Sequence, residues 1–116
     1  MSEIYSNVLF GLNKVNGVKK TALGTRDGFL ISEYENDDSE IMAHMAASMI
    51  QAAEKFANQL DEIRLNRVIV DFEDKKLIVA SAGPKAVISV MTTQDASLDP
   101  IISELDRTVE RIREII

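Results

Sequence analysis

The chain has 116 residues, of which 46% are hydrophobic and 28% charged, a balance typical of a folded globular protein with one core. We therefore expect a single domain over residues 1–116. Acidic side chains outnumber basic ones by 19 to 13, for a formal net charge of -6. This charge argues against nucleic acid as a partner, because phosphate binding requires clustered cations.

The chain contains no cysteine, which excludes disulfides, thiolate metal ligands and cysteine nucleophiles. No segment resembles the run of about 18 uncharged apolar residues that crosses a bilayer, so we expect no membrane insertion. The first residues lack the basic and apolar pattern of a signal peptide, and a cytoplasmic location is the expectation that follows.

The N-terminal part of the chain predicts a helix followed by a β-hairpin. Apolar side chains recur at helical spacing from Glu3 to Asn16. Two β-rich runs follow, Val18 to Thr25 and Phe29 to Glu33. Between them, Asp27-Gly28 supplies the positive φ that a tight turn needs.

A long central helix and a second group of strands account for the rest of the chain. The run from Glu40 to Leu60 is rich in alanine and methionine and predicts a helix. The remaining elements are three strands and a C-terminal helix, predicted over Arg67 to Glu73, Lys76 to Ala82, Lys85 to Thr93 and Asp99 to Ile116. Short connections favour antiparallel neighbours, because parallel pairing needs a crossover of about a dozen residues. The predicted order is αββαβββα.

The predicted central helix carries more apolar surface than it needs to dock on its own sheet. Its apolar arc is about 180° wide on a helical wheel, whereas docking requires a stripe of a little over about 100°. We predict that the side chains facing the sheet are Ile41, Met45, Ala52 and Phe56. Unless other core elements cover it, the additional strip would face a twofold mate or a partner protein, and it comprises Met42, Ala46, Ala53 and Ala57.

The sequence shows no catalytic constellation, cofactor motif or metal site. Around Gly17, Leu12 and Val18 stand where a phosphate-binding loop requires glycine and lysine. The single histidine, His44, is predicted on the solvated face of the central helix, and Ser48 occupies the i+4 position where a second metal ligand would stand. We therefore expect a protein that is not an enzyme and needs no cofactor or metal.

The element order and the hairpin from Thr25 to Ser32, in which Leu30 and Ile31 follow Asp27-Gly28, resemble the Roadblock family, also called the dynein light chain Roadblock class. The resemblance covers essentially the whole chain, as a single Roadblock-type domain. It implies an α/β (α+β) fold with a five-stranded antiparallel sheet, the central helix on one face and the terminal helices on the other. The second strand would form one edge, followed by the first, fifth, fourth and third.

The resemblance also implies a homodimer in which the third strands pair across a twofold axis and the central helices pack side by side. The implied contacts on the edge strand are Arg67, Val68, Ile69, Val70 and Asp71. The implied contacts on the central helix are Met42, Ala46, Met49 and Ala53, to which the helical wheel adds Ala57.

Members of this family act as protein platforms, and some bind and regulate small Ras-like GTPases, as the bacterial Mgl polarity regulators do. The resemblance therefore implies a homodimeric platform for such a GTPase. The alternative is a structural scaffold or adaptor subunit of a heteromeric Roadblock or longin-type complex, and a small-ligand sensor with an apolar cavity is a third interpretation. An arginine finger would have to be an exposed arginine on the docking surface, for which Arg64 and Arg67 are the candidates.

Overall fold

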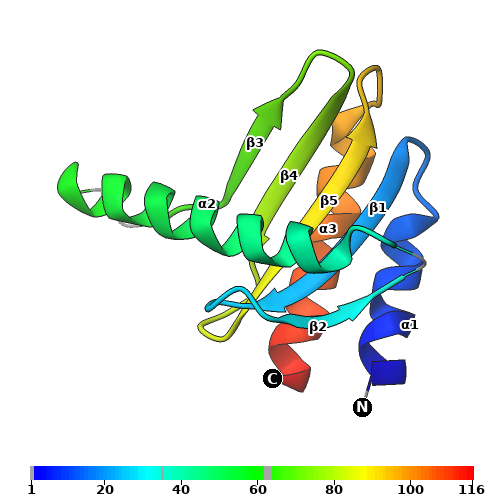
Figure 1. The fold of residues 1–116 in the computed structure, drawn as a ribbon, viewed down its shortest axis with the longest axis horizontal. Coiled ribbons are helices and arrows are strands. Elements are labelled where there is room, and N and C mark those ends of the chain that lie inside the picture. The colour runs from blue at the N-terminus through cyan, green and yellow to red at the C-terminus, as the bar shows by residue number, and fades with distance from the viewer. Residues whose placement is uncertain (1, 35, 62–63) are drawn as a thin grey trace.

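The computed structural model describes residues 2–34, 36–61 and 64–116 (Figure 1). In chain order its elements are α1 (Ser2–Asn13), β1 (Val18–Thr25), β2 (Leu30–Glu33), α2 (Ser39–Gln59), β3 (Arg67–Asp71), β4 (Lys75–Ser81), β5 (Ala86–Thr93) and α3 (Leu98–Ile115). The predicted αββαβββα order is confirmed.

The strands form one antiparallel sheet in the order β2-β1-β5-β4-β3. Helices α1 and α3 lie on one face of this sheet and α2 crosses the other, so the chain forms three layers (Figure 1). The predicted topology and the predicted distribution of helices are both confirmed. The two strands at the edges of the sheet are β2 and β3.

Two cores form because side chains alternate between the faces of each strand. Ile78 and Ile88 point to the α1 and α3 side, where they join the larger core with Leu9. On the α2 side, the smaller core comprises Ala22, Met42, Ala46, Ile50, Leu77, Val79 and Val87. The faces are thus closed by three helices, of which α2 alone covers the second face (Figure 1).

The prediction of which α2 side chains face the sheet is wrong. Ile41, Met45 and Phe56 are 62%, 47% and 65% exposed, and Ala52 is exposed as well. In their place, Met42 and Ala46 from the predicted partner-facing strip are 6% and 1% exposed in the smaller core. The wheel identified one wide arc correctly, but it assigned the two halves of that arc to the wrong surfaces.

A close contact between α2 and β1 explains this rotation of the helix. A Cβ atom at Gly24 would lie 2.9 Å from the Cβ of Ala43 and 3.0 Å from the carbonyl oxygen of Phe29. The helix backbone can therefore approach the strand only because both positions are small. With Ala43 against the sheet, the neighbouring Met42 and Ala46 are turned inward.

Two element boundaries differ from the predictions by more than one residue. Helix α1 ends at Asn13 rather than Asn16, and a turn stabilised by the hydrogen bond from the Val18 amide to the Val15 carbonyl (3.1 Å) follows it. Gly17 in this turn has a φ of 96°, the left-handed conformation that favours glycine. Strand β3 ends at Asp71, two residues before the predicted end.

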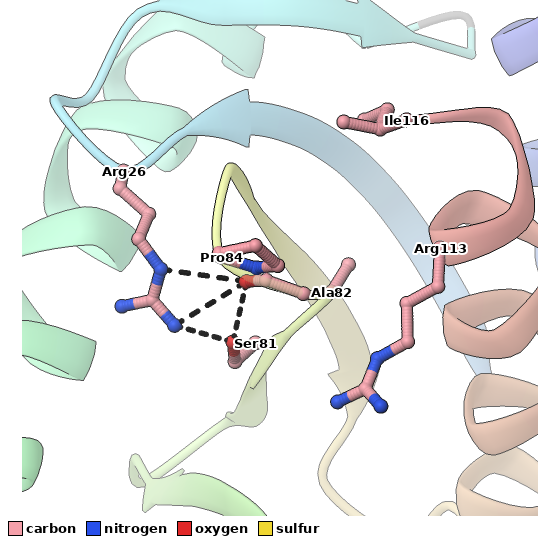
Figure 2. A pocket seen from close by; sticks show the side chains of 7 residues that line it. Arg26, Ser81, Ala82, Pro84, Arg113 and Ile116 are labelled. Carbon is pink, nitrogen blue, oxygen red and sulfur yellow. Dashed lines mark hydrogen bonds between the residues drawn. The ribbon is translucent and has the colours of Figure 1, made fainter.

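Arg26, in the turn after β1, links α2 to the turn between β4 and β5. Its guanidinium donates to Glu54 Oε1 on α2 (2.7 Å), to Ser81 Oγ (2.5 Å) and to the Gly83 carbonyl (3.4 Å), and Figure 2 shows the bonds to the β4–β5 turn. Gln51 on α2 donates in return to the Arg26 carbonyl oxygen at 2.8 Å. These bonds hold the middle of α2 over the ends of β1 and β4.

Truncation of Ile50 tests the observed rotation of α2. Ile50 is fully buried in the smaller core, so we expect Ile50→Ala to lower the free energy of unfolding by about 2–5 kcal/mol in a urea titration. Ser48→Ala, on the exposed side of the same helix, should change it by less than about 0.5 kcal/mol. Similar losses in both variants would contradict the rotation described above.

Removal of the Arg26 guanidinium tests whether its hydrogen bonds stabilise the fold. We expect Arg26→Gln to lower the free energy of unfolding by about 1–3 kcal/mol, because Glu54 and the Gly83 carbonyl lose a charged donor in a partly buried position. Arg111→Gln makes the same change of charge at an exposed position of α3 and should have little effect. If Arg26→Gln and Glu54→Gln prove additive in the double variant, the Arg26–Glu54 ion pair makes no net contribution to the free energy of unfolding.

Candidate interaction surface

Helix α2 carries a row of exposed or half-buried apolar side chains beside the arc that it buries. These side chains follow one another at intervals of three or four residues and form the apolar stripe, which comprises Ile41, Met45, Met49, Ala52, Phe56 and Leu60. Phe56 and Leu60 are 65% and 56% exposed. A contiguous apolar surface of this kind is typical of sites of protein interaction, whereas single exposed apolar side chains are common on any surface.

The C-terminal half of α2 extends beyond the sheet. In Figure 1 the helix crosses the strands obliquely and its last turns project past β3, the edge strand. Every residue from 51 to 60 is exposed or half-buried, in contrast to the buried Met42, Ala46 and Ile50 in the first half of the helix. The second half of the apolar stripe therefore has no sheet of its own chain beneath it.

An apolar hollow of about 310 Å³ lies between the first half of α2 and the turn that joins β3 to β4. We name it the methionine pocket, because its lining includes Met42, Met45, Met49 and Met91 together with Ile41 and Phe72. Four of the five methionines of the chain thus gather at one site. Unbranched thioether side chains adapt to an inserted apolar group more readily than branched ones do.

Strand β3 presents an open edge beside this pocket. Arg67 at its start donates from Nη2 to Asp106 on α3 at 3.1 Å, whereas its Nε is buried without an acceptor in the described part of the chain. Asp71 at its end accepts a hydrogen bond from Gln94, which together with nearby Lys76 lowers the pKa of the Asp71 carboxyl group below its usual value. The edge therefore begins with a cation and ends with an anion at neutral pH.

The residues predicted for a dimer interface divide into three groups in the structure. Met42 and Ala46 lie in the core of the same chain and contribute little accessible surface. The half-buried members on α2 are Met49, Ala53 and Ala57. The edge-strand members, Arg67, Val68, Ile69, Val70 and Asp71, form β3 as predicted. Whether this surface forms a dimer stays a prediction.

The sequence interpretation missed the residues that carry most of the exposed apolar surface. It placed Ile41, Met45 and Phe56 against the sheet, and it did not assign Leu60 or Phe72 to any contact. The small residue Gly24, paired in space with Ala43, is the signal that could have set the rotation of the helix, but this contact joins segments far apart in the sequence.

Two hollows with arginine in their linings lie at the end of the sheet that is held by Arg26. One, of about 390 Å³, is flanked by Arg26 and Arg113, as Figure 2 shows, and the other, of about 620 Å³, includes Arg64, Arg67 and Arg113 in its lining. The bond between Arg67 and Asp106 holds that guanidinium against α3, which makes Arg67 a poor arginine finger. Arg64 is exposed, as such a finger requires.

Across residues 2–34, 36–61 and 64–116, no three histidine, cysteine, aspartate or glutamate side chains form a group that could hold a metal ion. None of the helices in these ranges combines the length and the apolar character needed to cross a membrane. His44 is exposed on α2 next to the Gly28 turn.

Comparison with known proteins shows relatives of the same length and fold. An uncharacterized protein of Methanocaldococcus jannaschii, MJ0714, is 25% identical in an alignment of 115 residues that covers 97% of this chain and 97% of that protein. The solved structure of Myxococcus xanthus MglB superposes with a TM-score of 0.87 at 20% identity, over 97% of this chain and 94% of that one. A Roadblock/LC7 domain from Streptomyces avermitilis gives a TM-score of 0.86 at 19% identity, over 99% and 96%.

A family model gives the assignment. The model of the Roadblock/LC7 domain matches residues 5–92, which extend from α1 through the sheet into β5. The solved structures share the arrangement of three helices around a sheet of this topology. The chain belongs to the Roadblock/LC7 domain family.

Proposed function

We propose that this protein is a homodimeric interaction platform that binds and regulates a small Ras-like GTPase in the cytoplasm. The observation that supports the platform most directly is the apolar stripe of α2. The last turns of this helix project past β3, the edge strand (Figure 1). An open edge strand exposes unpaired backbone groups, and an apolar stripe exposes surface that water disfavours. A second copy of the chain would cover both at once.

The GTPase part of the proposal rests on family membership and on the likeness to MglB. If the apolar stripe is covered in the dimer, the surface of α2 left for a partner is its polar ridge, formed by His44, Ser48, Gln51, Lys55 and Asn58. These side chains are all exposed and lie on one side of the helix. Two such ridges, one from each copy, would form a continuous polar platform across the twofold axis.

The alternative function is that of a scaffold subunit in a heteromeric complex with other Roadblock or longin-type domains. A second exposed apolar site at the opposite edge of the sheet favours it. There Phe10 on α1, 41% exposed, packs edge-on against Tyr34 just after β2, with ring centres 5.3 Å apart. A chain that uses both edges could join two different neighbours.

A charge on the apolar stripe should disrupt the homodimer. Met45 is 47% exposed in the isolated chain, so Met45→Glu should leave the fold intact but turn a dimer into a monomer in light scattering, because the new carboxylate would be buried against an apolar surface. Ser48→Glu adds the same charge on the polar ridge, one turn away, and should remain dimeric. A wild-type protein that is monomeric at every concentration would remove the homodimer from the proposal.

A charge reversal on the polar ridge should weaken binding of the GTPase. We expect the wild-type protein to bind a small Ras-like GTPase of its own organism in at least one nucleotide state, as measured by calorimetric titration with the GDP-bound and GTP-bound forms. Lys55→Glu should weaken this binding by about tenfold or more without changing the oligomeric state, since a charge at an interface rim changes association. Arg111→Glu on α3, on the far side of the sheet, serves as the control.

Absence of binding in both nucleotide states would remove the GTPase from the proposal and leave the scaffold function. In that case, mixing experiments with other Roadblock or longin-type domains of the same organism should yield a heteromeric complex that depends on Phe10 or Tyr34.

A further inference from the structure

Arginine side chains gather at the end of the sheet where the β4–β5 turn lies. The two hollows there, of about 390 and 620 Å³, share Ser81 and Arg113 in their linings and therefore adjoin. We name the two hollows together the arginine trough, because four of the six arginines of the chain line it, Arg26, Arg64, Arg67 and Arg113. None of its lining residues belongs to the apolar stripe or to the polar ridge of α2. The trough is thus a separate surface of the molecule.

Two of these arginines are bonded to carboxylates of the same chain. Arg26 donates from Nη1 to Glu54 Oε1 at 2.7 Å, and its other nitrogens donate to the β4–β5 turn. Arg67 donates from Nη2 to Asp106 Oδ1 at 3.1 Å. Each pair is neutral as a whole, and together they fix the sides of the trough.

Arg113 is held in the trough by its hydrocarbon stem, and its guanidinium is left without a close acceptor. A Cβ atom at Gly83 would lie 3.4 Å from Arg113 Cγ, so the stem packs against the β4–β5 turn, and Figure 2 shows Arg26 and Arg113 on either side of that turn. The ion pair of Arg113 with Glu110 spans 3.8 Å, beyond hydrogen-bond distance. Arg64 is exposed and lines the same larger hollow.

The charge of the trough distinguishes between kinds of anion. Its lining holds four arginines and three carboxylates, those of Glu54, Asp106 and Glu110, which leaves a surplus of one positive charge. A carboxylate carries one negative charge and matches this surplus. A phosphate monoester carries about 1.5 to 2 negative charges near neutral pH, so the three carboxylates and the net charge of -6 on the chain would repel it more strongly.

Apolar side chains lie on both sides of Arg113 in the trough. In the larger hollow they are Leu65, Ala80 and Val109, and in the smaller one they are Ala82, Pro84 and Ile116. A ligand whose carboxylate lies at Arg113 would therefore have apolar surface available to the groups before and after it. Because the two hollows adjoin, an extended chain can pass from one to the other, which favours a side-chain carboxylate within a segment.

We propose that the arginine trough binds an extended segment of a partner protein through one glutamate or aspartate side chain with apolar residues on either side. Arg113 and Arg64 donate to the carboxylate, since a guanidinium matches the planar geometry of that group and charge-assisted hydrogen bonds are strong. The site does not depend on the proposed homodimer or on the GTPase, because it uses residues that neither of those contacts requires.

Titration with short peptides tests the chemistry of the ligand. The probe is acetyl-Ala-Leu-Glu-Leu-Ala-amide, added to isotope-labelled protein and followed by the NMR signals of the backbone amides. We expect saturable shifts at Ser81, Gly83 and Val109 and none at Met45 in the apolar stripe. The peptide with glutamine in place of glutamate should bind at least about tenfold more weakly, because it loses the charge-assisted hydrogen bonds.

Variants of two arginines on α3 test the location of the site. Arg113→Gln should weaken binding of the glutamate peptide by about tenfold or more, and Arg64→Gln should weaken it as well. Arg111→Gln is the matched control, because it removes the same charge from an exposed position of α3 that does not line the trough. Arg64, Arg111 and Arg113 are all exposed, so the three variants should give the amide spectrum of a folded protein.

Four results would overturn the inference. They are the absence of saturable shifts in the trough, equal binding of the glutamate and glutamine peptides, equal losses in Arg113→Gln and Arg111→Gln, and tighter binding of inorganic phosphate than of the glutamate peptide. The first three would remove the site, and the fourth would replace the carboxylate with a phosphate. None of these results bears on whether the protein forms a homodimer or binds a GTPase.

Discussion

The close approach of α2 to β1 at Gly24 and Ala43 is the constraint on which the rest of the structure depends. Because a single additional Cβ would lie 2.9 Å from Ala43, the helix has one rotation in which its backbone can reach the sheet. That rotation buries Met42, Ala46 and Ile50 and leaves the apolar stripe outside. The hydrogen bonds of Arg26 and Gln51 then hold the helix where it crosses the sheet, and so hold its second half beyond the edge strand.

Most of the fold could be predicted because its signals are local. The Asp27-Gly28 turn, the alternation in β3 and the short β3–β4 and β4–β5 connections each depend on neighbouring residues. The sheet order and the distribution of helices were implied by resemblance to a family, and the structure confirms them. The end of α1 was not predicted correctly from the sequence, because Gly17 lies in the turn that follows the helix and does not mark the last helical residue.

The interaction surface was predicted less well, for a physical reason. A helical wheel measures the width of an apolar arc, but the arc of α2 serves two surfaces and both halves contain methionine and alanine. Composition alone therefore cannot distinguish Met42, which is buried, from Met45, which is half exposed. The distinction depends on Gly24, a residue of another element, whose lack of a side chain becomes informative only once β1 and α2 are placed in contact.

The exposed half of the arc bears on how the protein can associate selectively. Large exposed apolar side chains such as Phe56 and Leu60 promote non-specific association unless a specific partner covers them. Coverage by a second copy of the chain, as proposed above, would remove this apolar surface from water. Of α2, such a dimer would leave only the polar ridges for other proteins.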